Sequence, residues 1–230
     1  MNNPSSTPAV PDVAVAVSAP TRRYEYETVG DEIYVQSFAT IRAEADLSAV
    51  PVDAETVAVR MIHACGQVDL SRDLVIHPGL VAATRTALRE GAPIFTDANM
   101  VASGVTRARL PQDNEVRCLL RDARVPDLAR RFGTTRSAAA VSLWGPDLEG
   151  AVVAIGNAPT ALFHLLELIS DGGPRPAAII GVPVGFIGAA ESKQALVDHP
   201  ADIPYLVVTG RRGGSAMAAS ALNALAQEKE

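Results

Sequence analysis

Three short apolar segments in the C-terminal part of the chain constrain the fold most strongly. They comprise residues 151–155, 177–180 and 205–208. Continuous apolar runs of this length are typical of strands that are buried on both faces of a sheet. Segments with helical character alternate with them, at residues 160–170, 191–197 and 215–227. This alternation predicts an α/β fold, with a mostly parallel sheet flanked by helices and right-handed connections.

The preceding residues extend the same fold. Apolar side chains recur at helical spacing from Tyr24 to about Asp46, which predicts an amphipathic helix that covers one side of the sheet. A second helix is expected to begin near Asp53 and to stop at Gly66. Further predicted elements are a helix at 78–90, a strand at 93–97, a strand at 114–121, a helix at 127–132 and a helix that begins after Thr135.

The first 22 residues are expected to lie outside the fold. Residues 1–22 are rich in Pro, Ser and Ala and lack an amphipathic period, which is typical of a disordered extension. The apolar run at 13–17 has no basic region before it and is bounded by prolines, so it resembles neither a signal peptide nor a membrane span. We therefore expect a cytoplasmic protein with a single α/β domain over residues 23–230.

The charge and motif content of the chain limit its ligands. The formal net charge is −6, so the protein as a whole does not attract nucleic acid, and an anionic ligand needs a local basic pocket. Cys65 and Cys118 are too few for a disulfide framework or a structural zinc site. The sequence contains no G-x-x-x-x-G-K-[ST], G-x-S-x-G or H-E-x-x-H motif and no cluster of metal ligands, so it predicts neither a metal nor another cofactor.

Glycine-rich turns follow each of the three apolar runs. They comprise residues 155–160, 181–188 and 210–215. Ligands of open parallel sheets bind beyond the carboxyl ends of the strands, so these turns are expected to share one crevice. The N–H groups of Gly213, Gly214 and Ser215, aided by Arg211 or Arg212, are suited to a carboxylate. A single turn of this kind is also explained by a sharp reversal between strand and helix, but three together favour a binding site.

His63 and Arg136 are the candidate catalytic and binding side chains. His63 is expected in the last turn of its helix, where the negative end of the helix dipole favours a protonated imidazole that can donate its proton. Arg136 stands at the start of a helix, where its cation lies beside free N–H groups and suits a carboxylate. Spacing alone leaves two other interpretations open: a core histidine bonded to a carbonyl, and an arginine in a surface ion pair.

Several separated strings resemble those of the precorrin-8X methylmutase family, in the same order, over roughly residues 24–226. The strings are RMIHACG at 60–66, TDANM at 96–100, TRS at 135–137, GNAPTA at 156–161, PVGF at 183–186, AESK at 190–193 and GGS at 213–215. Several strings in one order are far more specific than any single motif. The Pro-rich N-terminal extension lies outside this resemblance.

The resemblance implies an isomerase of cobalamin biosynthesis. The reaction it implies moves a methyl group from ring carbon 11 to carbon 12 of precorrin-8X, a 1,5-sigmatropic shift that gives hydrogenobyrinate. His63 matches the family's histidine, which is regarded as the general acid that protonates a ring nitrogen, and Arg136 matches the arginine that holds the substrate. Further substrate-binding candidates are Thr96, Ser137, Asn157, Glu191, Ser192, Gly213, Gly214 and Ser215.

The resemblance also implies a homodimer with sites near the subunit boundary, no metal or redox cofactor, and a product that can pass to the next enzyme of the pathway. Three other functions stay open. One is cobalt-precorrin-8 methylmutase of the oxygen-independent pathway, and another is a non-catalytic tetrapyrrole carrier, which would not need His63. The third, a nucleotide-dependent α/β enzyme, is disfavoured because the phosphate-binding fingerprints are missing. Neither nucleic acid nor a membrane is expected as a partner.

Overall fold

Four parallel strands form the centre of the sheet in the computed structural model, which describes residues 18–227. They are β2 (Ile94–Asp97), β4 (Val152–Ile155), β5 (Ala178–Gly181) and β6 (Tyr205–Val208). The strand order is β1-β6-β5-β4-β2-β3. At the edges, β3 (Val116–Arg117) runs parallel to β2, and β1 (Leu74–Ile76) runs antiparallel to β6. The predicted α/β fold with a mostly parallel sheet is therefore confirmed.

Most of the helices lie where the sequence predicts them. The helices are α1 (Gly30–Glu44), α2 (Glu55–Cys65), α3 (Leu80–Arg89), α4 (Asn99–Gly104), α5 (Val125–Phe132), α6 (Arg136–Val141), α7 (Pro159–Ser170), α8 (Ala189–Val197) and α9 (Ser215–Leu225). Gly66 ends α2 with a φ of +68°, which glycine adopts without a side-chain clash. Thr135 caps α6, since its Oγ1 accepts a hydrogen bond from the Ala138 N–H at 3.2 Å.

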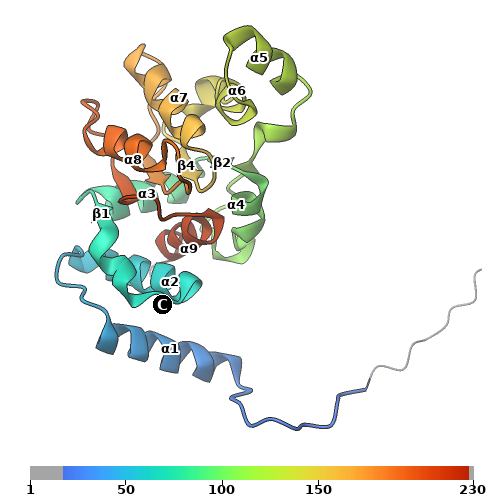
Figure 1. The fold of residues 1–230 in the computed structure, drawn as a ribbon, viewed down its shortest axis with the longest axis vertical. Coiled ribbons are helices and arrows are strands. Elements are labelled where there is room, and N and C mark those ends of the chain that lie inside the picture. Colours follow the sequence, from blue (N-terminus) through green and yellow to red (C-terminus); the bar gives the residue numbers. More distant parts are fainter. Residues whose placement is uncertain (1–17, 228–230) are drawn as a thin grey trace, which may run out of the picture.

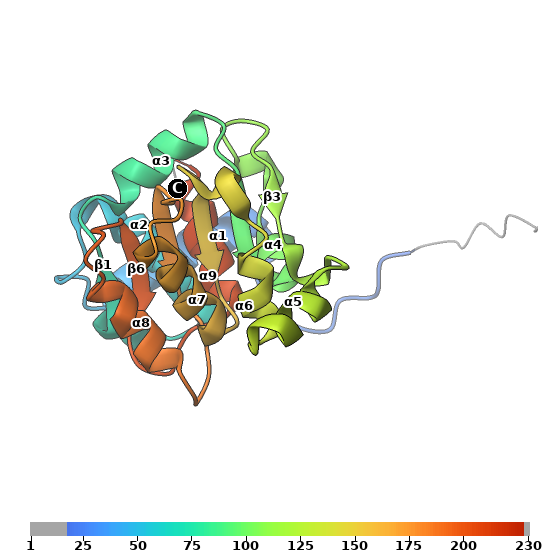
Figure 2. The ribbon, with the colours of Figure 1, turned by 90° about the horizontal axis from the view of Figure 1, so that it is seen from above.

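Successive residues of the central strands enter two separate apolar cores. On β4, Val152 and Ala154 belong to one core, Val153 and Ile155 belong to the other, and all four are fully buried. Helices α2, α3 and α9 cover the first face of the sheet, and α6, α7 and α8 cover the second (Figure 1). From above, α8, α7, α6 and α5 lie side by side along the second face (Figure 2). Burial on both faces explains why these strands are uninterrupted apolar runs.

Several local predictions are wrong. The first helix begins at Gly30 rather than near Tyr24, and its main contact is with α2 instead of the sheet (Figure 1). The strand predicted at 114–121 is only the short β3, followed by the 3-10 turn η4 (Leu119–Arg121). Asp53 lies inside the 3-10 turn η1 (Val52–Ala54) and does not cap α2. Strand β1 and helix α4 were not expected, because elements of three and six residues are too short to display a period.

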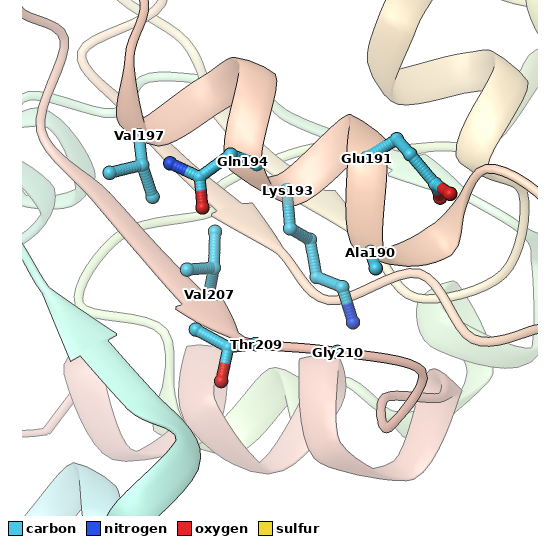
Figure 3. A pocket seen from close by; sticks show the side chains of 8 residues that line it. All are labelled: Ala190, Glu191, Lys193, Gln194, Val197, Val207, Thr209 and Gly210. Atoms are coloured by element: carbon cyan, nitrogen blue, oxygen red, sulfur yellow. The ribbon is translucent and has the colours of Figure 1, made fainter.

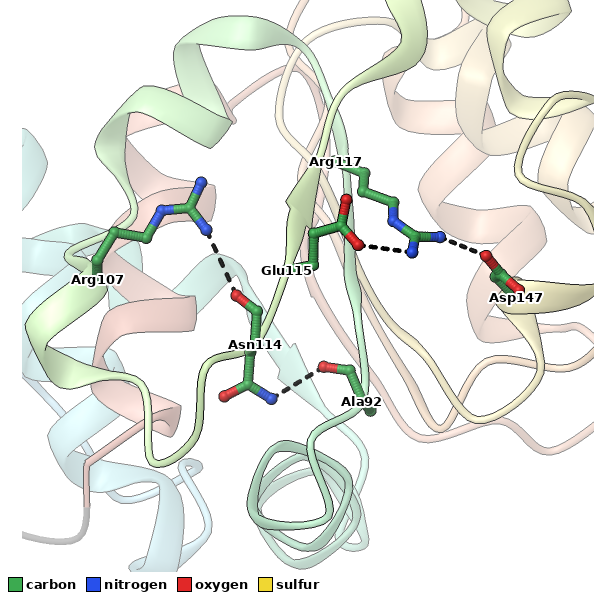
Figure 4. Close-up of polar contacts among 6 residues, drawn as sticks. All are labelled: Ala92, Arg107, Asn114, Glu115, Arg117 and Asp147. Carbon is green, nitrogen blue, oxygen red and sulfur yellow. Dashed lines mark hydrogen bonds and ion pairs between the residues drawn. The ribbon is translucent and has the colours of Figure 1, made fainter.

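Asn114 and Arg117 fix the edge of the sheet at β3 (Figure 4). The buried Asn114 side chain donates through Nδ2 to the carbonyls of Leu88 and Ala92, both at 2.9 Å. Arg117 lies on β3 and forms an ion pair with Asp147 at 2.5 Å. The segment between α3 and β2 and the turn before β4 are thereby both held to this edge strand.

The predicted N-terminal extension falls only partly within the described residues. Residues 1–17 lie outside them, so disorder over 1–22 and the domain boundary at residue 23 stay predictions. Residues 18–29 form neither helix nor strand, and all of them are exposed. Between residues 18 and 227, no helix has the length and apolar character needed to cross a membrane.

Candidate active site

The glycine-rich turns come together at the carboxyl edge of the sheet. The Val184 N–H donates to the Asn157 carbonyl at 3.4 Å, which joins the turn after β5 to the turn after β4. The Gly185 N–H donates to the Arg211 carbonyl at 3.3 Å, which joins it to the turn after β6. The prediction that these three turns meet is therefore confirmed.

Gly213 and Gly214 serve the packing of the turns against one another. A Cβ atom on Gly213 would lie 2.3 Å from the Val182 carbonyl oxygen and 2.4 Å from that of Pro183, so the backbones can approach only at glycine. The Gly214 N–H donates to the Val182 carbonyl at 2.9 Å. The prediction that this N–H is free for a carboxylate is wrong, because the neighbouring turn already occupies it. Ser215 is half-buried and begins α9 at the same edge.

A buried carboxylate links β2 to the start of α7. Asp97 is 3% exposed, and its Oδ2 accepts from the Ala158 N–H at 2.7 Å. Burial raises the pKa of Asp97, and hydrogen bonds from the Ala158 N–H and the Ser137 hydroxyl oppose that rise. Thr135 Oγ1 lies 2.7 Å from Thr160 Oγ1 and joins the starts of α6 and α7. Ser137 is thus placed at this edge beside a buried acid.

The other candidate side chains differ in accessibility. Arg136 and Asn157 are exposed, and the Arg136 guanidinium reaches the Leu120 carbonyl at 3.3 Å. Thr96 is 2% exposed, and its hydroxyl donates to a main-chain carbonyl of β3. Ser192 is fully buried, and its hydroxyl donates to a carbonyl of its own helix. Direct binding of a ligand by the Thr96 or Ser192 hydroxyl would therefore require the surrounding backbone to move.

Glu191 is one of the residues that line a cavity of about 250 Å³ between α8 and the end of β6 (Figure 3). Lys193, on the same helix, is 1% exposed, and its Nζ donates to the Arg212 carbonyl at 2.5 Å. Burial lowers the pKa of Lys193 to about 8, and the negative charge of Asp73 opposes this effect. Lys193 therefore anchors α8 to the glycine-rich turn after β6, whereas Glu191 stays exposed.

His63 lies in the last turn of α2, as predicted, and its side chain is exposed. Three residues of α1 contact one side of the imidazole. Ser37 Oγ is 2.8 Å from Nδ1, and the ring centres of Tyr34 and Phe38 are 5.4 and 5.3 Å from that of His63. The alternative of a core histidine bonded to a carbonyl is excluded by this exposure and by the hydroxyl partner. Across residues 18–227, nothing hydrogen bonds to Nε2, so this nitrogen is accessible for proton transfer.

Ion pairs bring the end of α2 to the glycine-rich edge. Arg212, in the turn after β6, bonds to Asp69 at 2.6 Å and to Asp73 at 3.2 Å. Both carboxylates belong to the 3-10 turn η2 (Val68–Asp73), which directly follows α2. Arg136 belongs to α6 on the opposite face of the sheet. A ligand that contacts both His63 and Arg136 of one chain must therefore extend across the carboxyl edge.

Sequence reasoning missed the surroundings of His63. Ser37, Tyr34 and Phe38 all fall within the segment predicted as an amphipathic helix, but nothing in the sequence connects them with His63. Their spacing of three and four residues could have indicated a shared face of α1. It could not have indicated which residue that face contacts, because this depends on how α1 packs against α2. Within residues 18–227, no group of three His, Cys, Asp or Glu side chains is arranged to hold a metal ion.

The relationship of the chain to known proteins follows from its sequence and its fold. A family model described as precorrin-8X methylmutase matches residues 32–228. The chain belongs to the precorrin-8X methylmutase family. As a member of this family it is an isomerase of cobalamin biosynthesis, so the alternative of a nucleotide-dependent enzyme is wrong.

Curated members of the precorrin-8X methylmutase family match almost end to end. The protein of that name from a Sinorhizobium species is 59% identical over 204 residues, which cover 89% of this chain and 97% of the relative. The protein from Pseudomonas aeruginosa is 59% identical over 206 residues, which cover 90% of this chain and 99% of the relative. Relatives named cobalt-precorrin-8 methylmutase, such as that of Priestia megaterium, are 32–39% identical.

A solved structure supports the same family assignment. The precorrin-8X methylmutase of Thermus thermophilus superposes with a TM-score of 0.77 at 39% sequence identity. The match covers 86% of this chain and 95% of that structure. The sheet and the helices that carry the candidate residues therefore belong to the common fold of the family.

Proposed function

We propose that this chain moves the methyl group on ring carbon 11 of precorrin-8X to carbon 12 and releases hydrogenobyrinate. In this proposal His63 is the general acid and Arg136 positions the substrate. The observation that carries it is the 59% identity with two curated precorrin-8X methylmutases over 97% and 99% of their lengths. The migration takes place within one molecule, so binding, orientation and one mobile proton suffice.

The geometry at His63 supports the acid role. Ser37 occupies Nδ1, which leaves Nε2 to face a ligand with a fixed ring orientation. A proton donated from Nε2 to a ring nitrogen withdraws electron density from the macrocycle and eases migration of the methyl group. The proton returns to Nε2 after the shift, so substrate and product have the same composition and His63 is restored.

The setting of Arg136 supports the positioning role. Its guanidinium is exposed and donates to the Leu120 carbonyl at 3.3 Å, so most of its five N–H donors face solvent. Precorrin-8X carries acetate and propionate groups, and a charge-assisted bidentate bond to one of them would fix the macrocycle in one orientation. The starts of α6 and α7, joined by Thr135 and Thr160, hold the Arg136 backbone in place.

The metal-free substrate is favoured over its cobalt-containing counterpart. Identity to the relatives named precorrin-8X methylmutase is 59%, compared with 32–39% for those named cobalt-precorrin-8 methylmutase.

Homodimer formation is also part of the proposal. Exposed apolar residues on α1 support it: Ile33, Tyr34 and Val35 are 45%, 46% and 63% exposed. Analytical ultracentrifugation tests the dimer, and transfer of the product to the next enzyme stays a prediction.

The decisive experiment is anaerobic incubation of the purified protein with precorrin-8X, followed by its visible spectrum. We expect wild type to convert the substrate, and His63→Ala to bind it without converting it. His199→Ala is the matched control, because His199 bonds to Ser170, away from α2 and the glycine-rich turns, and should leave turnover unchanged. Conversion of the cobalt substrate alone would reassign the substrate. Binding without turnover by wild type would indicate a carrier, and full activity of His63→Ala would remove His63 from the mechanism.

A further inference from the structure

A cavity of about 670 Å³ lies beside helix α1. Helix α1 contributes Tyr34, Phe38 and Arg42 to its lining, α2 contributes Arg60, and the segment before β3 contributes Arg109. The lining thus combines two aromatic rings with three guanidinium groups. In a chain with a net charge of −6, such a local concentration of cations calls for an explanation.

The three guanidinium groups differ in their surroundings. Arg42 forms an ion pair with Glu55 at 2.8 Å, and Arg60 lies over the Phe38 ring at 5.2 Å from its centre. The Arg109 guanidinium forms no ion pair and no hydrogen bond with any of residues 18–227. Asp31 adds one carboxylate to the lining. Asp31 and Glu55 thus place two carboxylates beside the three arginines, and Arg109 pairs with neither of them.

This cavity adjoins the candidate acid. Tyr34 and Phe38 line it, and the same two rings pack against the imidazole of His63 at 5.4 and 5.3 Å. Arg60 precedes His63 by three residues on α2, a spacing that places two side chains about 5–6 Å apart on one helix face. A propionate group extends a comparable distance from its ring carbon, whereas an acetate group is shorter. A carboxylate held in the cavity can therefore belong to a macrocycle whose ring lies at His63.

We infer that Arg109 and Arg60 bind a carboxylate side chain of the tetrapyrrole and that this cavity distinguishes a free carboxylate from its amide. The aromatic rings of Tyr34 and Phe38 cover the apolar stem of that side chain, while the guanidinium groups take its charged end. An amide would offer one acceptor and no charge, so it would leave the Arg109 guanidinium without a counterion. The inference rests on the proposed function and adds a specificity site to it.

The test uses hydrogenobyrinate as the probe and four proteins: wild type, Arg109→Gln, Arg109→Lys and Arg130→Gln. Arg130 is the matched control, because it is an exposed arginine on α5 that pairs with Asp127. Dissociation constants are measured by absorbance titration, at low salt and at high salt, with hydrogenobyrinate and with a derivative whose carboxylates are amidated. Steady-state turnover of precorrin-8X is measured in parallel, and thermal unfolding confirms that each variant is folded.

We expect Arg109→Gln to weaken hydrogenobyrinate binding by about tenfold, the loss of one charge-assisted contact. The KM for precorrin-8X should rise by a similar factor while kcat stays within about twofold, because Arg109 binds and His63 reacts. Arg109→Lys should recover part of the affinity, and Arg130→Gln should equal wild type. Arg109→Gln should show a smaller preference for the acid over the amide than wild type does. Its affinity for hydrogenobyrinate should also depend less on salt concentration.

Two results would overturn the inference. One is equal affinity of wild type and Arg109→Gln for hydrogenobyrinate, and the other is an undiminished preference for the acid over the amide in that variant. If wild type converts precorrin-8X in either case, the proposed function stands and only the specificity site is lost. If wild type neither converts precorrin-8X nor binds hydrogenobyrinate, the proposed function and the inference are overturned together.

Discussion

Ser37 Oγ lies 2.8 Å from Nδ1 of His63, and this contact joins two helices that are separated by a turn of the chain. The hydroxyl selects one orientation of the imidazole, because a ring rotated by half a turn would place a carbon atom at that position. The Tyr34 and Phe38 rings restrict the remaining freedom of the side chain. The atom that His63 presents to a ligand is therefore determined by α1.

Replacement of Ser37 by alanine should lower kcat about tenfold with little change in KM. The imidazole would lose the partner that holds Nδ1 in place, while the surfaces that bind substrate are unaltered. Ser37→Thr keeps the hydroxyl and should retain most of the activity. Anaerobic steady-state kinetics on both variants provides the measurement. Equal kcat values for Ser37→Ala and wild type would show that Ser37 does not orient the acid.

Replacement of Gly213 by alanine should lower the free energy of unfolding by about 2–4 kcal/mol. The new methyl group would meet the Val182 and Pro183 carbonyl oxygens at 2.3 and 2.4 Å, so two glycine-rich turns must separate. Gly30→Ala is the control, because its methyl group would have no neighbour within 4 Å and Gly30 is the first residue of α1. Urea unfolding compares the two variants, and a Gly213→Ala protein as stable as Gly30→Ala would contradict the prediction.

Replacement of Asn114 by alanine should destabilise the protein by about 2–4 kcal/mol, since two carbonyls near the end of α3 lose their donor. The Asn114 Oδ1 atom also accepts from the Gln112 N–H at 3.2 Å, and this bond would be lost too. Gln112→Ala keeps that N–H and serves as the control. Thermal and urea unfolding of both variants give the comparison. A small effect at Asn114 would mean that water replaces the lost donor.

The stability of the protein should depend on Lys193 at alkaline pH. Its pKa is about 8 in the folded protein and 10.5 in the unfolded chain, so between these values the unfolded chain binds more protons. The contribution of Lys193 to the free energy of unfolding therefore rises as the pH increases from about 8 to 10.5. Below pH 8 the cost of burying its protonated ammonium group is fully present. Urea unfolding of wild type and Lys193→Met across this range should show the rise only in wild type. If the free energy of unfolding had the same pH dependence in both proteins, the prediction would be contradicted.

The sequence predicts the central sheet well, because strands β4, β5 and β6 are buried on both faces and leave uninterrupted apolar runs. It also predicts the meeting of the three turns, since the carboxyl ends of parallel strands share one edge. It fails at β1, whose three residues are recruited by pairing with β6, a contact between distant parts of the chain. The Gly214 N–H shows the same limit, because its acceptor is set by a neighbouring turn and not by local sequence.

The position of α1 also explains why the surroundings of His63 cannot be predicted from the sequence. The apolar face predicted for this helix comprises Val29, Ile33, Phe38 and Ile41. Phe38 and Ile41 are buried, whereas Val29 and Ile33 are 54% and 45% exposed, so the spacing is only partly correct. The partner of that face is α2 rather than the sheet, so the segment was expected in a different place. The cavity at Arg109 is a consequence of this packing, because α1, α2 and the segment before β3 meet there only in the folded protein.

The peripheral attachment of α1 has a consequence for how this enzyme can lose activity. Because α1 contacts mainly α2 and supplies no strand, its detachment would leave the six-stranded sheet and both apolar cores largely intact. If α1 dissociated after a proteolytic cut between α1 and α2, the remaining folded protein would have a His63 that lacks Ser37, Tyr34 and Phe38. Inactivation and unfolding are separable events here, and global melting curves would not register the first of them.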